Sequence, residues 1–186
     1  MRIWLLVCGL LAAIVGGIAV AGSDDKPLKV GDKAPEFALP WATADKIELS
    51  NLWKLSDHDA KKPVVVAFYP ADFSGGCTKQ MCSYRDDFKE IEGLGVELAP
   101  ISGDYVFSHQ AWCKQEKFPF ALLSDHLHKV AAAYGSYNAD YGWNIRTVFL
   151  VDTKGNIRYI DWHYNPMADS PSFPNLKAAI RDLKKT

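Results

Sequence analysis

Two cysteines five residues apart stand where an apolar stretch gives way to a predicted helix. Cys77 and Cys82 follow the segment 70–76, which reads Pro-Ala-Asp-Phe-Ser-Gly-Gly. Unpaired N–H groups at a helix N-terminus stabilise an anion, so the Cys77 thiol is expected to be partly thiolate at neutral pH. A thiolate attacks electrophiles, and Cys82 offers a second thiol to resolve a covalent intermediate. The pattern favours a nucleophilic cysteine site over two buried structural cysteines or a structural disulfide.

The residues just before Cys77 are expected to form a small pocket beside it. Gly75 and Gly76 let the backbone approach a bound molecule closely, and Ser74 offers a hydroxyl to the same space. We expect the two glycines to lie in a flexible turn that precedes the helix.

The elements that must position this site alternate between strand and helix. The run 63–70 is apolar and β-branched, which is typical of a strand buried on both faces. Apolar residues at helical spacing predict a helix over about 77–92, which Gly93 and Gly95 end. Similar patterns predict strands at 96–102, 121–123, 147–152 and 157–162, and helices at 108–116 (capped by Ser108), 127–134 and 175–185. This order predicts an α/β domain with a central mixed sheet flanked by helices on both faces.

Composition excludes several classes of protein. The chain has 186 residues and a formal net charge of −1, and 48% of its residues are hydrophobic. The balanced charge argues against binding to nucleic acid, which needs a surplus of cations. The apolar content excludes a disordered chain. The four cysteines are too few for a disulfide-stapled scaffold, and they show no metal-finger spacing.

The first 21 residues resemble a targeting segment. Residues 3–21 carry no charge, Arg2 precedes them, and Ala19-Val20-Ala21 fits a signal-peptidase site. We therefore predict a signal peptide at 1–21, a linker at 22–27 and the folded domain at 28–186. The domain would be exported to a periplasm-like or extracellular space, and it would meet a membrane only if the segment stays uncleaved as an anchor. Cleavage would remove Cys8 and leave an odd number of cysteines, which hints at redox chemistry.

Dispersed motifs in the right order resemble the peroxiredoxin family. Pro-x3-Ser-x2-Cys at 70–77 is similar to the peroxiredoxin signature, and Cys-Thr-x-Gln-x-Cys at 77–82 is similar to the peroxiredoxin Q or bacterioferritin-comigratory-protein branch. The resemblance also includes VGDKAPEF at 30–37, LLSD at 122–125 and IRTVFLVD at 145–152. It implies a thioredoxin-like fold and a thiol-dependent peroxidase acting on hydrogen peroxide and organic hydroperoxides.

The resemblance also implies a role for each site residue. Cys77 would be the peroxidatic cysteine, which becomes a sulfenic acid. Ser74 and Arg146 would bind the peroxide oxygens, Arg146 would stabilise the thiolate, and Pro70 would shield the site from water. Most family members have Thr in place of Ser74, and this branch usually has Pro-Gly in place of Gly75-Gly76. A thioredoxin-like or other thiol reductant is implied, no cofactor or metal is expected, and a monomer is expected.

Two cysteines compete for the resolving role. Family members place the resolving cysteine either five residues after the first, as Cys82 is, or in the next helix, where Cys113 lies. We favour Cys82, with Cys113 as an inert buried residue. His109, four residues before Cys113, is expected to be a solvated surface histidine.

Two other functions fit the composition less well. Exported copper-delivery proteins of thioredoxin fold carry the motif Cys-x3-Cys and a later histidine, for which His163 would be the candidate here. The cysteine spacing in this sequence is Cys-x4-Cys instead. A disulfide reductase needs Cys-x2-Cys, which this sequence lacks.

Overall fold

A seven-stranded mixed sheet organises the protein. The computed structural model describes residues 27–183, and the predicted signal peptide lies outside them. The sheet has the order β2-β1-β5-β4-β3-β8-β9, and a separate two-stranded sheet pairs β6 with β7. The strands are β1 (Ala38–Ala42), β2 (Ile47–Lys54), β3 (Val64–Phe68), β4 (Glu97–Ser102), β5 (Leu122–Ser124), β6 (Tyr137–Asn138), β7 (Trp143–Asn144), β8 (Thr147–Val151) and β9 (Ile157–Asp161).

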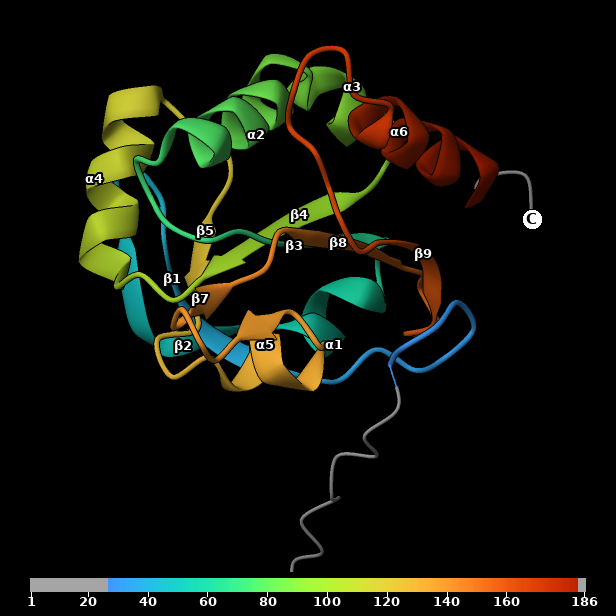
Figure 1. Cartoon of the computed structure of the whole chain (residues 1–186), viewed down its shortest axis with the longest axis horizontal. Coiled ribbons are helices and arrows are strands. Elements are labelled where there is room, and N and C mark those ends of the chain that lie inside the picture. Colours follow the sequence, from blue (N-terminus) through green and yellow to red (C-terminus); the bar gives the residue numbers. More distant parts are fainter. Residues whose placement is uncertain (1–26, 184–186) are drawn as a thin grey trace, which may run out of the picture.

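Helices cover both faces of this sheet (Figure 1). They are α1 (Leu55–Asp59), α2 (Gly75–Asp86), α3 (Phe88–Gly93), α4 (Val106–Glu116), α5 (Lys129–Ala133) and α6 (Ser172–Leu183). In Figure 1, α2, α3 and α6 lie on one face, α1 and α5 lie on the other, and α4 stands at the side of β5 and β1. The predicted thioredoxin-like α/β architecture is confirmed.

Strand β3 is the centre of the core because it is apolar on both faces. All five of its residues are fully buried, and it pairs parallel with β4 and antiparallel with β8. Val65 and Ala67 belong to the apolar cluster under α2 and α6, whereas Val66 and Phe68 belong to the cluster over α1 and α5. A strand with polar residues on one face could not join two such clusters.

Most predicted elements are present, with shifted ends. The single helix predicted at 77–92 is two helices, because the chain leaves helical geometry at Asp87 (φ −96°, ψ 12°). The next helix begins at Val106, so Ser108 lies inside it and is not its cap. The strands predicted at 147–152 and 157–162 pair as the antiparallel hairpin β8–β9, and Gly155 adopts φ +71° in its turn.

Two pairs of strands were not predicted. The hairpin β1–β2 extends the sheet beyond β5, and the small β6–β7 pair precedes Arg146. Within residues 27–183 no helix is both long and apolar enough to cross a membrane.

Candidate active site

The site begins where β3 leaves the sheet and the chain turns into α2. Tyr69 still donates its backbone N–H to Ile101, and Phe73 then adopts a left-handed conformation with φ +59°. Ser74 is the N-cap residue of α2, which begins at Gly75. The chain therefore reverses over a few residues and directs the start of α2 towards the ends of β3 and β8.

Cys77 lies in the first turn of α2 and is fully buried. Its Sγ atom is 3.4 Å from both Nη1 and Nη2 of Arg146, and these contacts join residues far apart in the sequence. The helix N-terminus and the guanidinium both place positive charge beside the sulfur. The geometry therefore supports a buried nucleophile.

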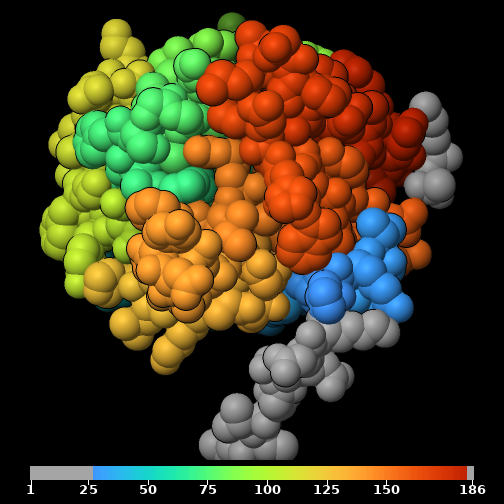
Figure 2. All heavy atoms as spheres, viewed as in Figure 1, coloured from blue at the N-terminus to red at the C-terminus, as the bar shows by residue number. Residues whose placement is uncertain are grey.

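Arg146 is held in position by two features of α2. Its Nη1 donates to Oε1 of Gln80, one turn after Cys77, at 2.6 Å. A Cβ atom on Gly76 would lie 3.0 Å from Nη2, so a side chain there would crowd the guanidinium. Gly76 therefore makes room for Arg146, and Gln80 fixes its orientation. Figure 2 shows the start of α2 (green) against the segment that contains β6 and β7 and precedes Arg146 (orange).

Ser74 and Pro70 flank the same site. The Ser74 hydroxyl donates to the Ala71 carbonyl at 3.1 Å, and the Ser74 carbonyl accepts from the N–H and the hydroxyl of Thr78. The proton of the Ser74 hydroxyl is therefore occupied, and its oxygen remains able to accept a hydrogen bond. Pro70 is half-buried directly after β3 and Tyr69.

The other two thiols lie in different environments. Cys82 is half-buried on α2, with its Sγ 3.7 Å from Oε2 of Glu116. Burial, together with the Glu116 carboxylate, raises the pKa of the Cys82 thiol. Cys113 is fully buried on α4, and burial raises its pKa to about 12. All three described cysteines are free thiols.

Three expectations about this region need correction. Gly75 and Gly76 are the first residues of α2 and do not form a separate flexible turn. Ser108 does not cap α4, because its hydroxyl donates to Asp72. His109 is not solvated, because its side chain is fully buried against Asp72.

Sequence reasoning also missed several polar residues around the site. Gln80 was noted only as part of a motif, although it is fully buried and binds Arg146. Asp72 was assigned no role within the segment 70–76, although its carboxylate accepts three side-chain hydrogen bonds. The available signal was a carboxylate two residues beyond a buried strand end, followed by a histidine in a helix that packs nearby. His163 is exposed just after β9, and no cluster of three or more potential metal ligands occurs in the part of the chain that the structure describes.

Comparison with known proteins identifies the family. The AhpC/TSA family model matches residues 30–160. The chain belongs to this family. It is 40% identical to chloroplastic peroxiredoxin Q of Triticum aestivum over 131 residues, which are 70% of this chain and 57% of the relative. It is also 35% identical to the putative peroxiredoxin bcp of Coxiella burnetii over 136 residues, covering 70% of this chain and 85% of that protein.

Solved structures of AhpC/TSA relatives agree with the fold. The crystal structure of peroxidoxin BcpB from Mycobacterium tuberculosis matches with a TM-score of 0.71 and 28% identity, covering 84% of this chain and 98% of that chain. The expected resemblance to peroxiredoxin Q and bacterioferritin-comigratory proteins is therefore confirmed. The chain spans only 57% of the length of the wheat and rice relatives, and nothing in these comparisons supports copper delivery.

Proposed function

We propose that this chain is a thiol peroxidase that reduces hydrogen peroxide and organic hydroperoxides. The Cys77 thiolate attacks one oxygen of the O–O bond, which breaks, so that sulfur is oxidised to a sulfenic acid and the other oxygen leaves as water or an alcohol after protonation. The observation that carries this proposal is the pair of 3.4 Å contacts between Cys77 Sγ and the Arg146 guanidinium inside a buried helix start. Membership of the AhpC/TSA family supports it.

Contacts in the structure support roles for three neighbouring residues in this reaction. Arg146 faces Cys77 with two N–H groups, so it can stabilise both the thiolate and the charge that develops on the leaving oxygen. Ser74 donates to Ala71, so it would accept a hydrogen bond from the peroxide. Pro70 has no N–H to solvate, and it would limit water at the mouth of the site.

We propose Cys82 as the resolving thiol. It would attack the Cys77 sulfenic acid, form a disulfide and release water. Helical residues five apart are separated by about 7.5 Å along the axis and about 140° around it, whereas a disulfide needs Cα atoms roughly 4.4–6.8 Å apart. The start of α2 must therefore unwind. Gly75 and Gly76 each weaken that helix by up to about 1 kcal/mol relative to alanine, and Ser74 makes no side-chain cap.

A thioredoxin-like or other dithiol would then reduce the disulfide and be oxidised in turn. Unwinding would bring the disulfide to the surface, where such a partner can reach it. The expected monomer stays a prediction, which light scattering of the reduced and oxidised protein checks.

Three variants, each with one cysteine replaced by serine, test the proposed role of each thiol. Cys77→Ser should abolish peroxide consumption, because an alcohol stays protonated where the thiol ionises. Cys82→Ser should still form one sulfenic acid per chain but lose turnover with a dithiol reductant. Cys113→Ser is the matched control and should keep both activities.

Each variant can contradict a specific part of the proposal. Peroxide turnover retained by Cys77→Ser would overturn the peroxidase assignment. Full turnover in Cys82→Ser, together with loss in Cys113→Ser, would transfer the resolving role to the α4 thiol.

We also propose that residues 1–21 are a targeting segment that exports the domain. The charge-free run at 3–21 and the Ala19-Val20-Ala21 site support secretion, whereas several relatives are named as chloroplastic. Intact mass of the protein from its own cell decides between these fates. A mature chain that begins at Gly22 supports export, and an intact Met1 in the membrane fraction would favour an uncleaved anchor instead.

A further inference from the structure

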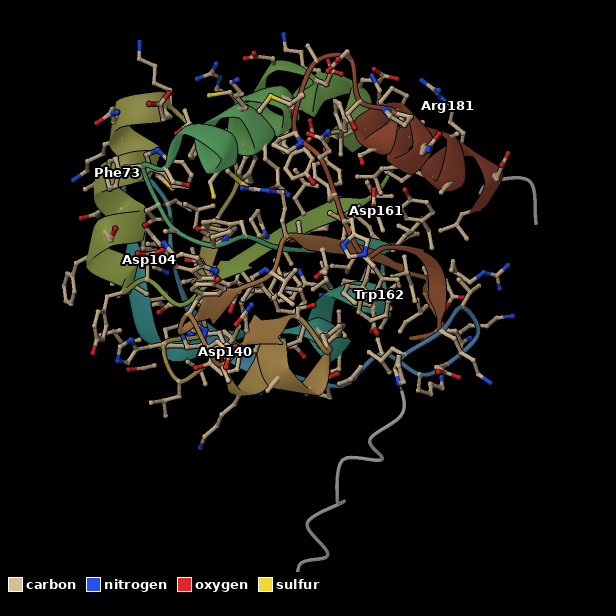
Figure 3. All side chains as sticks on the ribbon, viewed as in Figure 1. Phe73, Asp104, Asp140, Asp161, Trp162 and Arg181 are labelled. Carbon is tan, nitrogen blue, oxygen red and sulfur yellow. The ribbon has the colours of Figure 1, made fainter. Side chains whose placement is uncertain are left out.

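A buried polar cluster lies just upstream of Cys77, and the proposed chemistry does not use it. Its centre is the pair Asp72 and His109, whose side chains are 1% and 0% exposed. Asp72 belongs to the turn between β3 and α2, and His109 belongs to α4. The pair therefore joins the segment that carries Pro70 and Ser74 to a helix on the side of the sheet. In Figure 3, Phe73 and Asp104, which flank this cluster, both lie against α4.

Asp72 accepts hydrogen bonds from three side chains. Its Oδ1 accepts from the Tyr69 hydroxyl at 2.8 Å. Its Oδ2 accepts from the Ser108 hydroxyl at 2.7 Å and lies 2.8 Å from Nδ1 of His109. The backbone N–H of Asp72 donates to Oδ2 of Asp104 at 2.9 Å. The turn is thus attached to β3, to α4 and to the loop that follows β4.

Both ring nitrogens of His109 face acceptors. Nδ1 faces the Asp72 carboxylate, and Nε2 lies 3.2 Å from the carbonyl oxygen of Leu123 on β5. A neutral imidazole carries only one N–H. Its unprotonated ring nitrogen would therefore face a buried oxygen acceptor with no proton between the two atoms. An imidazolium donates to both, and the Asp72 carboxylate compensates its charge. An imidazolium therefore satisfies both acceptors at once.

The surrounding titratable groups agree with this assignment. Tyr69, directly after β3, and Cys113 on α4 both face Asp72. Burial raises the pKa of each, well above its usual value for Tyr69 and to about 12 for Cys113. These two groups are neutral at ordinary pH. The remaining charges are the carboxylates of Asp72 and of Asp104, the latter of which also accepts from Ser102. His109 is then the cation that offsets them.

We propose that His109 is a positioning residue for the peroxidase reaction, a buried imidazolium that clamps Asp72 to β5 and thereby holds the turn before Cys77. This inference rests on the proposed function, because it concerns how Pro70 and Ser74 stay in place around the reacting sulfur. When α2 unwinds to let Cys77 reach its partner thiol, the clamp keeps the upstream turn fixed. Reduction then returns Cys77 to the same position beside Arg146.

Nitrogen-15 NMR of the reduced, unmodified protein tests the protonation state directly. We expect both ring nitrogens of His109 to carry protons across the neutral pH range, and the signals of the exposed His126 in the same spectra serve as the internal comparison. A neutral tautomer at His109 would overturn the clamp. This result is independent of peroxidase activity, so it stands apart from the Cys77→Ser assay.

A double-mutant cycle on the rate of Cys77 oxidation tests positioning. His109→Asn and Asp72→Asn should each lower that rate by roughly tenfold, since small displacements of a reacting group are costly, while His126→Asn should leave it unchanged. The double variant should lose less than the two single losses combined, because neither charge is left buried alone. Asp72→Asn should also show a new pH-dependent step that the double variant lacks. Additive losses, or wild-type rates in both single variants, would overturn the proposal.

Discussion

The chain is held in opposite ways on the two sides of Cys77. Upstream, the Asp72 carboxylate accepts from Tyr69, Ser108 and His109, and the contacts with Tyr69 and His109 are buried. Downstream, α2 starts with two glycines, lacks an acidic residue in its first turn and has no side-chain cap. The upstream side is tied to other elements by buried charge, and the downstream side depends on a weak helix start.

This difference suits a reaction with two geometries. Attack on peroxide needs Cys77 beside Arg146, whereas disulfide formation needs Cys77 to move towards Cys82. A site held firmly on both sides could perform the first step but not the second. A site loose on both sides would not restore the first geometry after each cycle. The boundary between the two sides falls at Ser74.

Removal of the contact between Arg146 and Cys77 at the start of α2 should have the largest effect on the rate. Arg146→Ala should lower the rate constant for peroxide reduction by roughly 10² or more, because a preorganised donor to the reacting atoms is lost. Arg158→Ala is the matched control, since Arg158 is an exposed arginine on β9 that pairs only with Asp152 among the ion pairs described. Stopped-flow kinetics measures both variants. Equal rates for Arg146→Ala and the unmodified protein would show that the guanidinium is only structural.

The labelling rates of Cys82 on α2 and of Cys113 on α4, the helix that anchors the upstream side, should differ by about tenfold or more. Burial raises the pKa of the Cys82 thiol and raises that of the Cys113 thiol to about 12, so at pH 8 both thiols are mostly protonated. In Cys77→Ser, iodoacetamide should modify Cys82 first, and both rates should rise with pH as the thiolate fraction grows. Peptide mass spectrometry follows the labelling. Earlier labelling of Cys113 would mean that α4 opens more readily than α2.

The two glycines should separate the reaction steps with effects of several-fold. Gly75→Ala has open space around its new Cβ, so it should strengthen the helix by about 1 kcal/mol and slow disulfide formation about fivefold without slowing peroxide attack. Gly76→Ala places a Cβ 3.0 Å from Arg146 Nη2, so it should also slow attack on peroxide. Rapid-quench trapping of the sulfenic acid resolves the two steps. Identical behaviour of both variants would show that neither space nor helix strength matters here.

Much of the fold could be predicted because its signals are local. The buried strand β3 and the hairpin β8–β9 follow from apolar runs and a Gly-containing turn. The break at Asp87 could not be predicted, because the apolar spacing continues through it into α3. The hairpin β1–β2 was missed since β2 is largely exposed and carries a weak strand pattern.

The site was predictable where a motif names the residue and not where the partner is remote. Cys77 and Arg146 could be paired in advance only through resemblance to a family, because 69 positions separate them. The environment of His109 depends on Asp72 and Leu123, which lie on other elements, so its sequence neighbours indicated a surface position instead. The assignment of Gly75 and Gly76 to a flexible turn was wrong because α2 already begins at Gly75, so both glycines lie in its first turn.

Hydrogen exchange of the reduced and oxidised protein tests the central claim most directly. If oxidation releases only the downstream side, amides at about 76–84 should exchange much faster in the disulfide form, while those of β3 and of the turn at 69–73 keep their protection. The mass difference would be confined to peptides from α2. Equal protection of residues 76–84 in both forms, or loss of protection that extends to Asp72 and His109, would contradict the account.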